Sequence, residues 1–278
     1  MKSLFDVCAP AKLNLFLHIV GRRPDGYHLL ESVFALIDWC DTLHFELRND
    51  GQLSREDLGS ALPDQDLVLR AASALQQFSG TRHGAHIAIN KRIPAEAGMG
   101  GGSSDAASTL LALNRLWGLK LDLASLLGIG LKLGADVPFF LAGKNAFVTG
   151  IGEKLMPISV PLTRYLVVKP AEGLETRRIF SHPLLKRDTQ PTIIAGFATS
   201  ADGFGRNDLQ EIAMQQCPGI GSALNWLDRK GLSGQMTGSG SAVFARLPHD
   251  VETHDAPRSF QVKVCSSLSE HPLIGWAD

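Results

Sequence analysis

The sequence predicts an α+β fold, and three observations lead to that prediction. Segments with strand character and segments with helix character interleave without the strict strand–helix–strand period of a doubly wound sheet. Residues 12–19 alternate with the two-residue period of a half-buried strand. Residues 107–117 place apolar side chains at helical spacing directly after a glycine-rich loop. The chain of 278 residues can form one large domain or two smaller domains that share a cleft.

The first predicted strand covers residues 12–19. Its apolar face would hold every second residue, namely Leu13, Leu15, Leu17 and Ile19. Lys12 and Asn14 would then lie together on the opposite face. His18 would lie on that face as well, and we expect it to have a structural role.

Five further segments complete the first third of the chain. Residues 24–26, Pro-Asp-Gly, mark a turn, and an apolar stretch follows at residues 29–39. Residues 49–66 are polar and contain Gly, Pro and Asp, so a loop is expected there. Residues 67–78 have helical character, and residues 86–90 form a plausible short strand.

Two helices are expected next. The first begins at Ser103 or Ser104, after the glycine-rich residues 94–102, and stops at Gly118. The second runs over residues 122–133, because an aspartate N-cap opens it and a glycine follows it.

Asp136 follows the second helix. Val137 precedes Pro138 and is therefore expected to be extended, which would put Asp136 in an exit loop rather than on a helix.

The second half of the chain is expected to hold a strand–helix mixture of the same kind. The predicted elements are strands near 145–149 and 164–169, helices near 207–217 and 219–230, a glycine-rich loop at 237–241 and a strand at 242–247. The segment 150–161 is punctuated by Gly and Pro. It divides the chain into an N-terminal lobe of residues 1–155 and a C-terminal lobe of residues 156–278.

Charge and composition exclude several classes of protein. Lys and Arg total 27 against 28 Asp and Glu, and nucleic-acid-binding proteins usually carry a basic excess. No uncharged apolar run reaches the roughly 18 residues of a membrane span, so no contact with a membrane is expected. Asp6 and Pro10 interrupt any signal peptide. The 4 cysteines lack zinc-ligand spacing and are expected to be reduced thiols of a cytoplasmic protein.

The strongest chemical signal is a glycine-rich loop that runs into a helix. Glycine allows close backbone approach and positive φ, so that successive N–H groups can converge on an anion. The first amides of the helix lack internal partners, and the two serines could add hydroxyl donors or a ligand for phosphate-bound Mg²⁺. The predicted ATP-binding residues are Pro94, Ala95, Glu96, Ala97, Gly98, Met99, Gly100, Gly101, Gly102, Ser103 and Ser104.

This loop differs from the commoner phosphate-binding loops. A P-loop requires G-K-[ST], and Gly143-Lys144 is followed by Asn145. A dinucleotide fingerprint that begins at Gly98 would need glycine at position 103, which is serine. The remaining alternative is a flexible linker that happens to precede a helix.

Residues 94–107 resemble the phosphate-binding motif of the GHMP kinase superfamily, which includes galactokinase, homoserine kinase and mevalonate kinase. Five more stretches carry the resemblance, at residues 9–15, 23–28, 134–140, 207–209 and 236–241. The similarity spans about residues 8–247. It implies a two-lobed fold with the active site in the cleft between the lobes, and transfer of a phosphoryl group from ATP with Mg²⁺.

The resemblance also implies two catalytic residues. Asp136 would accept or orient the proton of the acceptor hydroxyl, and Lys12 would keep that carboxylate ionised and offset charge on the phosphoryl group. Without the family context, Asp136 could equally bond local amides at a helix end, and Lys12 could be a surface lysine. Two departures near the expected nucleotide are Asp66, where the family often has asparagine, and the pair Ala95-Glu96.

Residues 23–28 resemble a segment of one group within the family, whose substrate is a cytidine diphosphate-linked methylerythritol. The implied reaction phosphorylates the 2-hydroxyl of this small molecule in isoprenoid biosynthesis. Tyr27 would stack on cytosine and His28 would read its edge, or both would merely pack the turn. Phe180 could cover the other ring face or be a core aromatic.

The remaining expectations from the resemblance concern the substrate channel and the competing functions. Asn14 and Thr176 would line the channel, and Lys144 would either reach a substrate phosphate or be solvated. Other possible functions are another small-molecule kinase such as homoserine kinase, a decarboxylase of the same fold, and a nucleotide-binding regulator without catalysis. Lys12 together with Asp136 argues against the regulator.

Overall fold

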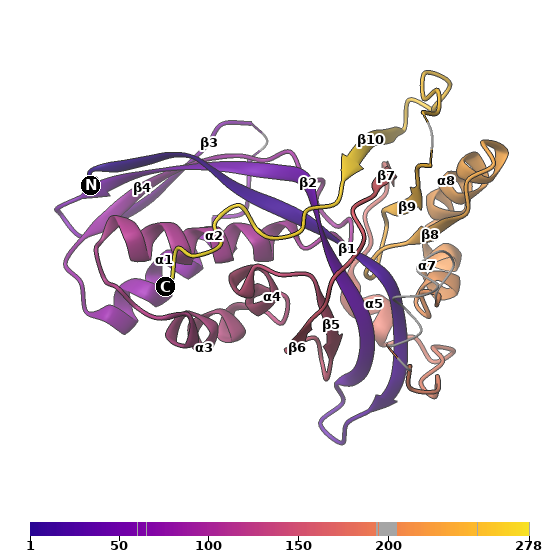
Figure 1. The fold of residues 1–278 in the computed structure, drawn as a ribbon, viewed down its shortest axis with the longest axis horizontal. Coiled ribbons are helices and arrows are strands. Elements are labelled where there is room, and N and C mark those ends of the chain that lie inside the picture. The colour runs from indigo at the N-terminus through magenta and orange to yellow at the C-terminus, as the bar shows by residue number, and fades with distance from the viewer. Residues whose placement is uncertain (60, 65, 193, 195–204, 249, 278) are drawn as a thin grey trace.

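The computed structural model describes residues 1–278 except 60, 65, 193, 195–204, 249 and 278. Two β-sheets and several helices interleave along the chain, and most strand pairs are antiparallel. Figure 1 shows helices α1 to α4 packed beside the larger sheet, and α7 and α8 beside the smaller one. The predicted α+β class is therefore confirmed.

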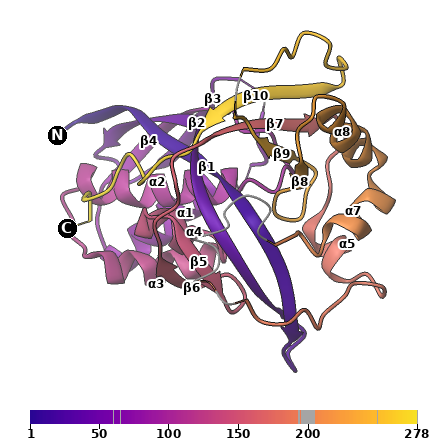
Figure 2. The same cartoon turned by 45° about the vertical axis from the view of Figure 1, so that its right-hand side comes forward.

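A long hairpin forms the centre of the molecule. Its strands, β1 (Ser3–Arg22) and β2 (His28–Arg48), run antiparallel along their whole lengths (Figures 1 and 2). The turn between them is closed by the Arg23 N–H, which donates to the Tyr27 carbonyl at 2.7 Å. Gly26 adopts a φ of 91°, which glycine tolerates best. This confirms the turn predicted at residues 24–26.

The middle of β1 is buried on both faces, so the predicted half-buried pattern is wrong there. Lys12 and Asn14 are only 3% and 1% exposed. Leu13 and Leu15 pack against the second sheet, in a cluster with Tyr165 of β7 (Arg164–Pro170). The opposite face is covered as well, because the hairpin crosses between the helices and that sheet (Figure 2).

A β-bulge also changes which residues share a face. The register of β1 on β2 shifts between Asn14 and Leu17. Leu17 thereby moves to the side of Lys12, and both line the same cavity. The prediction that His18 shares the face of Lys12 is therefore wrong. Its Nδ1 lies 3.0 Å from the Thr192 hydroxyl, a contact that agrees with the expected structural role.

The larger sheet has the strand order β3-β4-β2-β5-β6, with β1 added on β2. Its other strands are β3 (Leu53–Asp57), β4 (Gly84–Asn90), β5 (Ala146–Thr149) and β6 (Lys154–Pro157). The loop predicted over 49–66 is wrong for residues 53–57, because β3 pairs in parallel with β4. The partner strand β4 is distant in the sequence, so the polar composition of residues 49–66 gives no sign that β3 forms.

Helices α1 (Leu67–Ser79), α2 (Gly101–Leu116) and α3 (Leu123–Leu133) match three predicted helices. The side chain of Asp122 caps α3 by accepting from the Ser125 N–H at 2.9 Å, as its position predicts. The start predicted for α2 at Ser103 or Ser104 is wrong by two residues or more. Gly100 is its N-cap, and Gly101 and Gly102 lie inside its first turn.

A short helix, α4 (Val137–Ala142), follows Asp136, which lies in the turn after α3 and outside both helices, as predicted; the extended conformation predicted for Val137 is wrong. Asp136 occupies the N-cap position, and Val137 is helical instead of extended. Pro138 favours this arrangement because proline is well suited to the first turn of a helix, where its missing N–H is not needed.

The smaller sheet has the order β10-β7-β9-β8 and is antiparallel. Its elements not yet given are β8 (Gly234–Met236), β9 (Val243–Arg246) and β10 (Phe260–Ser266), with helices α5 (Thr176–Phe180), α7 (Gln210–Gln216) and α8 (Pro218–Arg229) beside it. The division into two lobes, residues 1–155 and 156–278, stays a prediction. The last residues return to the first half of the chain, where Trp276 lies 4.7 Å from the Arg115 guanidinium.

All four cysteines are free thiols. Among the described residues, no helix combines the length and the apolar character needed to cross a membrane. A cytoplasmic location stays a prediction.

Candidate active site

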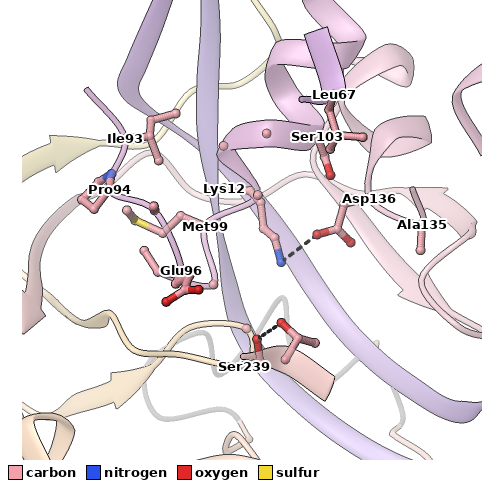
Figure 3. Close-up of a pocket in the computed structure, with 18 of the residues that line it drawn as sticks. Lys12, Leu67, Ile93, Pro94, Glu96, Met99, Ser103, Ala135, Asp136 and Ser239 are labelled. Carbon is pink, nitrogen blue, oxygen red and sulfur yellow. Dashed lines mark hydrogen bonds and ion pairs between the residues drawn. The ribbon is translucent and has the colours of Figure 1, made fainter. Parts of the chain in front are cut away.

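A cavity of about 600 Å³ lies where the hairpin, α2, α4 and α5 meet. Figure 3 shows Lys12 and Asp136 pointing toward each other in its middle. Leu67 and Ser103 lie on one side of this pair, and Ser239 lies on the other. Segments that are far apart in the sequence therefore meet at one cavity.

The glycine-rich loop lines this cavity over residues 94–103. Ser104 differs from the other predicted ATP-binding residues, because it is fully buried behind the loop. Its N–H donates to the Gly100 carbonyl at 2.9 Å, as the first backbone bond of α2. The N–H groups of residues 101–103 precede that bond and have no partner within the helix. The start of α2 therefore offers these amides to the cavity.

Glycines in this loop also let it pack against a second loop. A Cβ atom on Gly98 would lie 2.2 Å from the Thr237 carbonyl oxygen, and one on Gly238 would lie 2.5 Å from the Gly98 carbonyl oxygen. The Ser241 N–H donates to the Glu96 carbonyl at 3.0 Å. The loop at 237–241 thus packs directly against the glycine-rich loop. This close contact requires glycine at positions 98 and 238.

Lys12 is a buried cation with a fixed set of neighbours. Its Nζ donates to Asn14 Oδ1, lies 3.6 Å from Asp136 Oδ2 and stands 4.1 Å above the ring of Phe34. Burial lowers the pKa of Lys12, and the nearby Asp136 opposes this shift. The geometry therefore places an ammonium group and a carboxylate side by side at the centre of the cavity.

Asp136 lies at the N-cap of α4 and lines the cavity. Its side chain is 32% exposed, so it reaches the cavity, whereas that of Lys12 is 4% exposed. The carboxylate is also close to Gly152, where a Cβ atom would lie 3.8 Å from Asp136 Oδ1. That distance is ordinary van der Waals contact, and it is the φ of 116° at Gly152 that favours glycine there.

The predicted substrate residues divide into two groups. Thr176 and Phe180, both on α5, line the cavity, and the Thr176 hydroxyl lies 2.7 Å from that of Ser239. Contrary to the prediction, Asn14 does not line the cavity; it is buried behind Lys12, whose Nζ donates to its Oδ1. Tyr27 and His28 do not line the cavity either; His28 packs on Phe180 with a ring-centroid distance of 5.3 Å, and Tyr27 beside it is 59% exposed.

Some polar residues at the cavity were missed because no motif marks them. Lys91 Nζ binds Asp41 and lies 2.5 Å from Asp105 Oδ2, just behind the start of α2. Desolvation and the neighbouring Asp41 raise the pKa of Asp105 to about 8, although Lys91 opposes the shift. Lys144 does not line this cavity and instead bridges Glu270 through the backbone.

Comparison with known proteins agrees with this geometry. Residues 66–144 match the N-terminal domain of GHMP kinases, and residues 193–269 match their C-terminal domain. The 4-diphosphocytidyl-2-C-methyl-D-erythritol kinase of Albidiferax ferrireducens is 67% identical over 277 residues, which is 100% of this chain and 96% of that protein. The chain belongs to the GHMP kinase family. The first matched segment contains the glycine-rich loop and Asp136, and the second contains Ser239.

Within the GHMP kinases, the chain groups with the 4-diphosphocytidyl-2-C-methyl-D-erythritol kinases. The enzyme of that name from Paracidovorax citrulli is 60% identical and is covered over 99% of its length, with 100% of this chain matched. A crystal structure of 4-(cytidine 5'-diphospho)-2C-methyl-D-erythritol kinase superposes with a TM-score of 0.76 at 31% identity, and covers 95% of this chain and 98% of its own. The GHMP kinase resemblance stated from the motifs is thus confirmed.

A more distant neighbour indicates how general the fold is. Homoserine kinase from Cytophaga hutchinsonii superposes with a TM-score of 0.71 over 98% of this chain and 96% of its own, at 15% identity. Such a likeness shows a shared fold and says nothing about a shared substrate.

Proposed function

We propose that this GHMP kinase transfers a phosphoryl group from ATP to the 2-hydroxyl of 4-diphosphocytidyl-2-C-methyl-D-erythritol, giving the 2-phosphate and ADP. The observation that carries the proposal is the Lys12–Asp136 pair, which lies between the start of α2 and the aromatic side chain of Phe180 on α5. A phosphate donor bound at one side and an alcohol bound at the other would meet at this pair. The reaction belongs to the non-mevalonate route of isoprenoid biosynthesis.

Lys12 and Asp136 would act on the reacting groups directly. Asp136 would accept a hydrogen bond from the acceptor hydroxyl and orient or take its proton. Lys12, desolvated and fixed by Asn14, would stabilise negative charge that develops on the transferred phosphoryl group. Phosphoryl transfer depends mainly on such positioning and electrostatic stabilisation.

ATP would be held by the glycine-rich loop and α2. The amides of residues 101–103 face the triphosphate, while Leu67 and Ile93 contribute apolar contacts for the base end. Mg²⁺ usually takes one or two protein oxygens together with phosphates, and the Ser103 hydroxyl and the Asp136 carboxylate at the cavity are hard oxygen donors of this kind. When bound, the ion would neutralise charge on the phosphates.

Gly101→Val is expected to weaken ATP binding about 10-fold or more with the fold retained. A Cβ atom at this position would lie 3.0 Å from Ile93 Cγ2, so valine crowds the cavity wall and displaces the start of α2. Isothermal titration with a non-hydrolysable ATP analogue measures the change, and circular dichroism checks the fold. Gly128→Val is the matched control, because it adds the same side chain to α3 where a Cβ meets nothing. Unchanged affinity in the Gly101 variant would remove residues 94–104 from the phosphate site.

The substrate is tested by product analysis with MgATP and a panel of alcohols. We expect phosphorylation of the cytidine diphosphate-linked substrate, slower reaction of its uridine analogue, and little or none of free methylerythritol or homoserine. Equal use of homoserine would overturn the proposal and leave only the family assignment.

The roles proposed for the aromatic residues are tested by two variants. His28→Ala should narrow the difference in kcat/KM between the cytidine and uridine substrates, because a site that bonds the base edge discriminates by leaving wrong partners unpaired. Tyr27→Ala should weaken both substrates alike, since stacking does not depend on edge chemistry. A His28→Ala variant with full discrimination would show that the base edge is read elsewhere.

A further inference from the structure

The edge of the His28 imidazole is held by an arginine from a distant part of the chain. Arg187 Nε donates to His28 Nε2 at 3.0 Å, across 159 positions of sequence. His28 is 8% exposed, and the Phe180 ring packs on it. This contact therefore lies directly behind the aromatic part of the proposed substrate site.

The contact with Arg187 decides which nitrogen of His28 carries its proton. A guanidinium group has five donors, no acceptor, and a charge that it keeps at all ordinary pH values. Nε2 of His28 must therefore be the acceptor and must lack a proton. Burial lowers the pKa of His28, and the positive charges of Arg187 and Arg22 lower it further, which favours the neutral ring that the hydrogen bond from Arg187 requires. A neutral imidazole with an unprotonated Nε2 has its proton on Nδ1.

Arg187 is itself held in place by the turn that follows α5. Its Nη1 donates to the Leu185 carbonyl at 2.9 Å, and its Nη2 donates to the His182 carbonyl at 2.8 Å. Leu185 is buried and anchors this turn in the core. With three donors engaged, the guanidinium is a rigid group that ties His28 on β2 to the segment that carries Phe180.

We propose that Arg187 is a positioning residue that sets the choice of pyrimidine, by holding His28 as an Nδ1–H donor aimed at the ring acceptor N3 of cytosine. The proposal rests on the function proposed above and adds the residue that determines its base specificity. In the described part of the chain, no side chain or backbone group bonds Nδ1, so this donor is available to a ligand.

The chemistry of the two bases explains why the tautomer matters. Cytosine has an acceptor at N3, whereas uracil has an N–H there. An Nδ1–H donor therefore pairs with cytosine and opposes uracil. The other tautomer, with its proton on Nε2, would present an acceptor at Nδ1 and would suit uracil instead. Without Arg187 the ring can adopt both states, and the discrimination should decline.

Nitrogen NMR tests the tautomer without any substrate. In ¹⁵N-histidine-labelled protein, the His28 signals, identified by their loss in His28→Gln, should show a protonated Nδ1 and an unprotonated Nε2. In Arg187→Met they should shift toward the Nε2–H form or toward an average of the two. Lys186→Met, an exposed neighbouring lysine, is the control and should leave the signals unchanged. An Nε2–H signal in the unaltered protein would refute the proposal.

Kinetics with the two nucleotide-linked substrates test the consequence. Arg187→Met should raise KM for the cytidine substrate about 10-fold, with a smaller effect on kcat, and should lower the cytidine-to-uridine ratio of kcat/KM by a similar factor. Arg187→Lys, which keeps a cationic donor, should recover part of the ratio.

The two proposals fail in different ways. If the unaltered enzyme uses both substrates equally, the proposed base specificity is wrong. If it discriminates and Arg187→Met discriminates just as well, the function stands and the role of Arg187 is overturned.

Discussion

Asp136→Asn is expected to lower kcat about 100-fold or more while ATP affinity changes little. The amide has nearly the same shape as the carboxylate, but it cannot take a proton. It also lacks the negative charge that complements Lys12 at 3.6 Å. The triphosphate is expected to bind at residues 94–103, which the substitution does not touch. Steady-state turnover and titration with a non-hydrolysable ATP analogue separate the two effects.

A matched control is Asp228→Asn, the same chemical change on an exposed residue of α8. It should retain full turnover. Full activity of the Asp136 variant would remove this residue from the mechanism. A parallel loss of ATP affinity would mean that Asp136 mainly supports the nucleotide through its Mg²⁺ ion.

Lys12→Met is expected to lower kcat about 100- to 1,000-fold, the range for loss of a preorganised group that stabilises transition-state charge. Methionine fills most of the same volume above Phe34, so the buried site should not collapse. Without the ammonium, the carboxylate of Asp136 would face the incoming phosphates with no compensating charge. Single-turnover rates at saturating ATP measure the effect on the chemical step.

Lys144→Met is the control for this second variant, because Lys144 lies outside the cavity. The double variant Lys12→Met/Asp136→Asn adds a further test. Residues that act as one unit show strongly non-additive losses, so the double variant should be little slower than the worse single variant. If the loss of kcat in the double variant equals the product of the two single losses, the two side chains act independently.

Local patterns accounted for a large part of the fold. The turn at 24–26, the α1 and α3 helices and the glycine-rich loop each depend on a few neighbouring residues whose conformational preferences agree. Two of the errors came from non-local pairing. The strand β3 exists because it pairs with β4, and the bulge in β1 changes the partner of every residue after Asn14.

The same distinction holds for the candidate site. Residue types and spacing alone marked the phosphate loop as an anion site, because glycine conformation and unpaired helix amides are local properties. Lys91 with Asp105 and Arg187 with His28 have no such local signature.

The α+β class, the family and the catalytic candidates Lys12 and Asp136 could all be inferred from the order and type of the residues alone. The folded chain was needed to show that these two side chains lie 3.6 Å apart, that Lys12 is buried between two packed layers, and that Arg187 donates to His28 Nε2. The reason is physical. Charge–charge distance, burial and tautomer depend on groups brought together from remote parts of the chain, and the packing of the hairpin between two layers determines which of them meet.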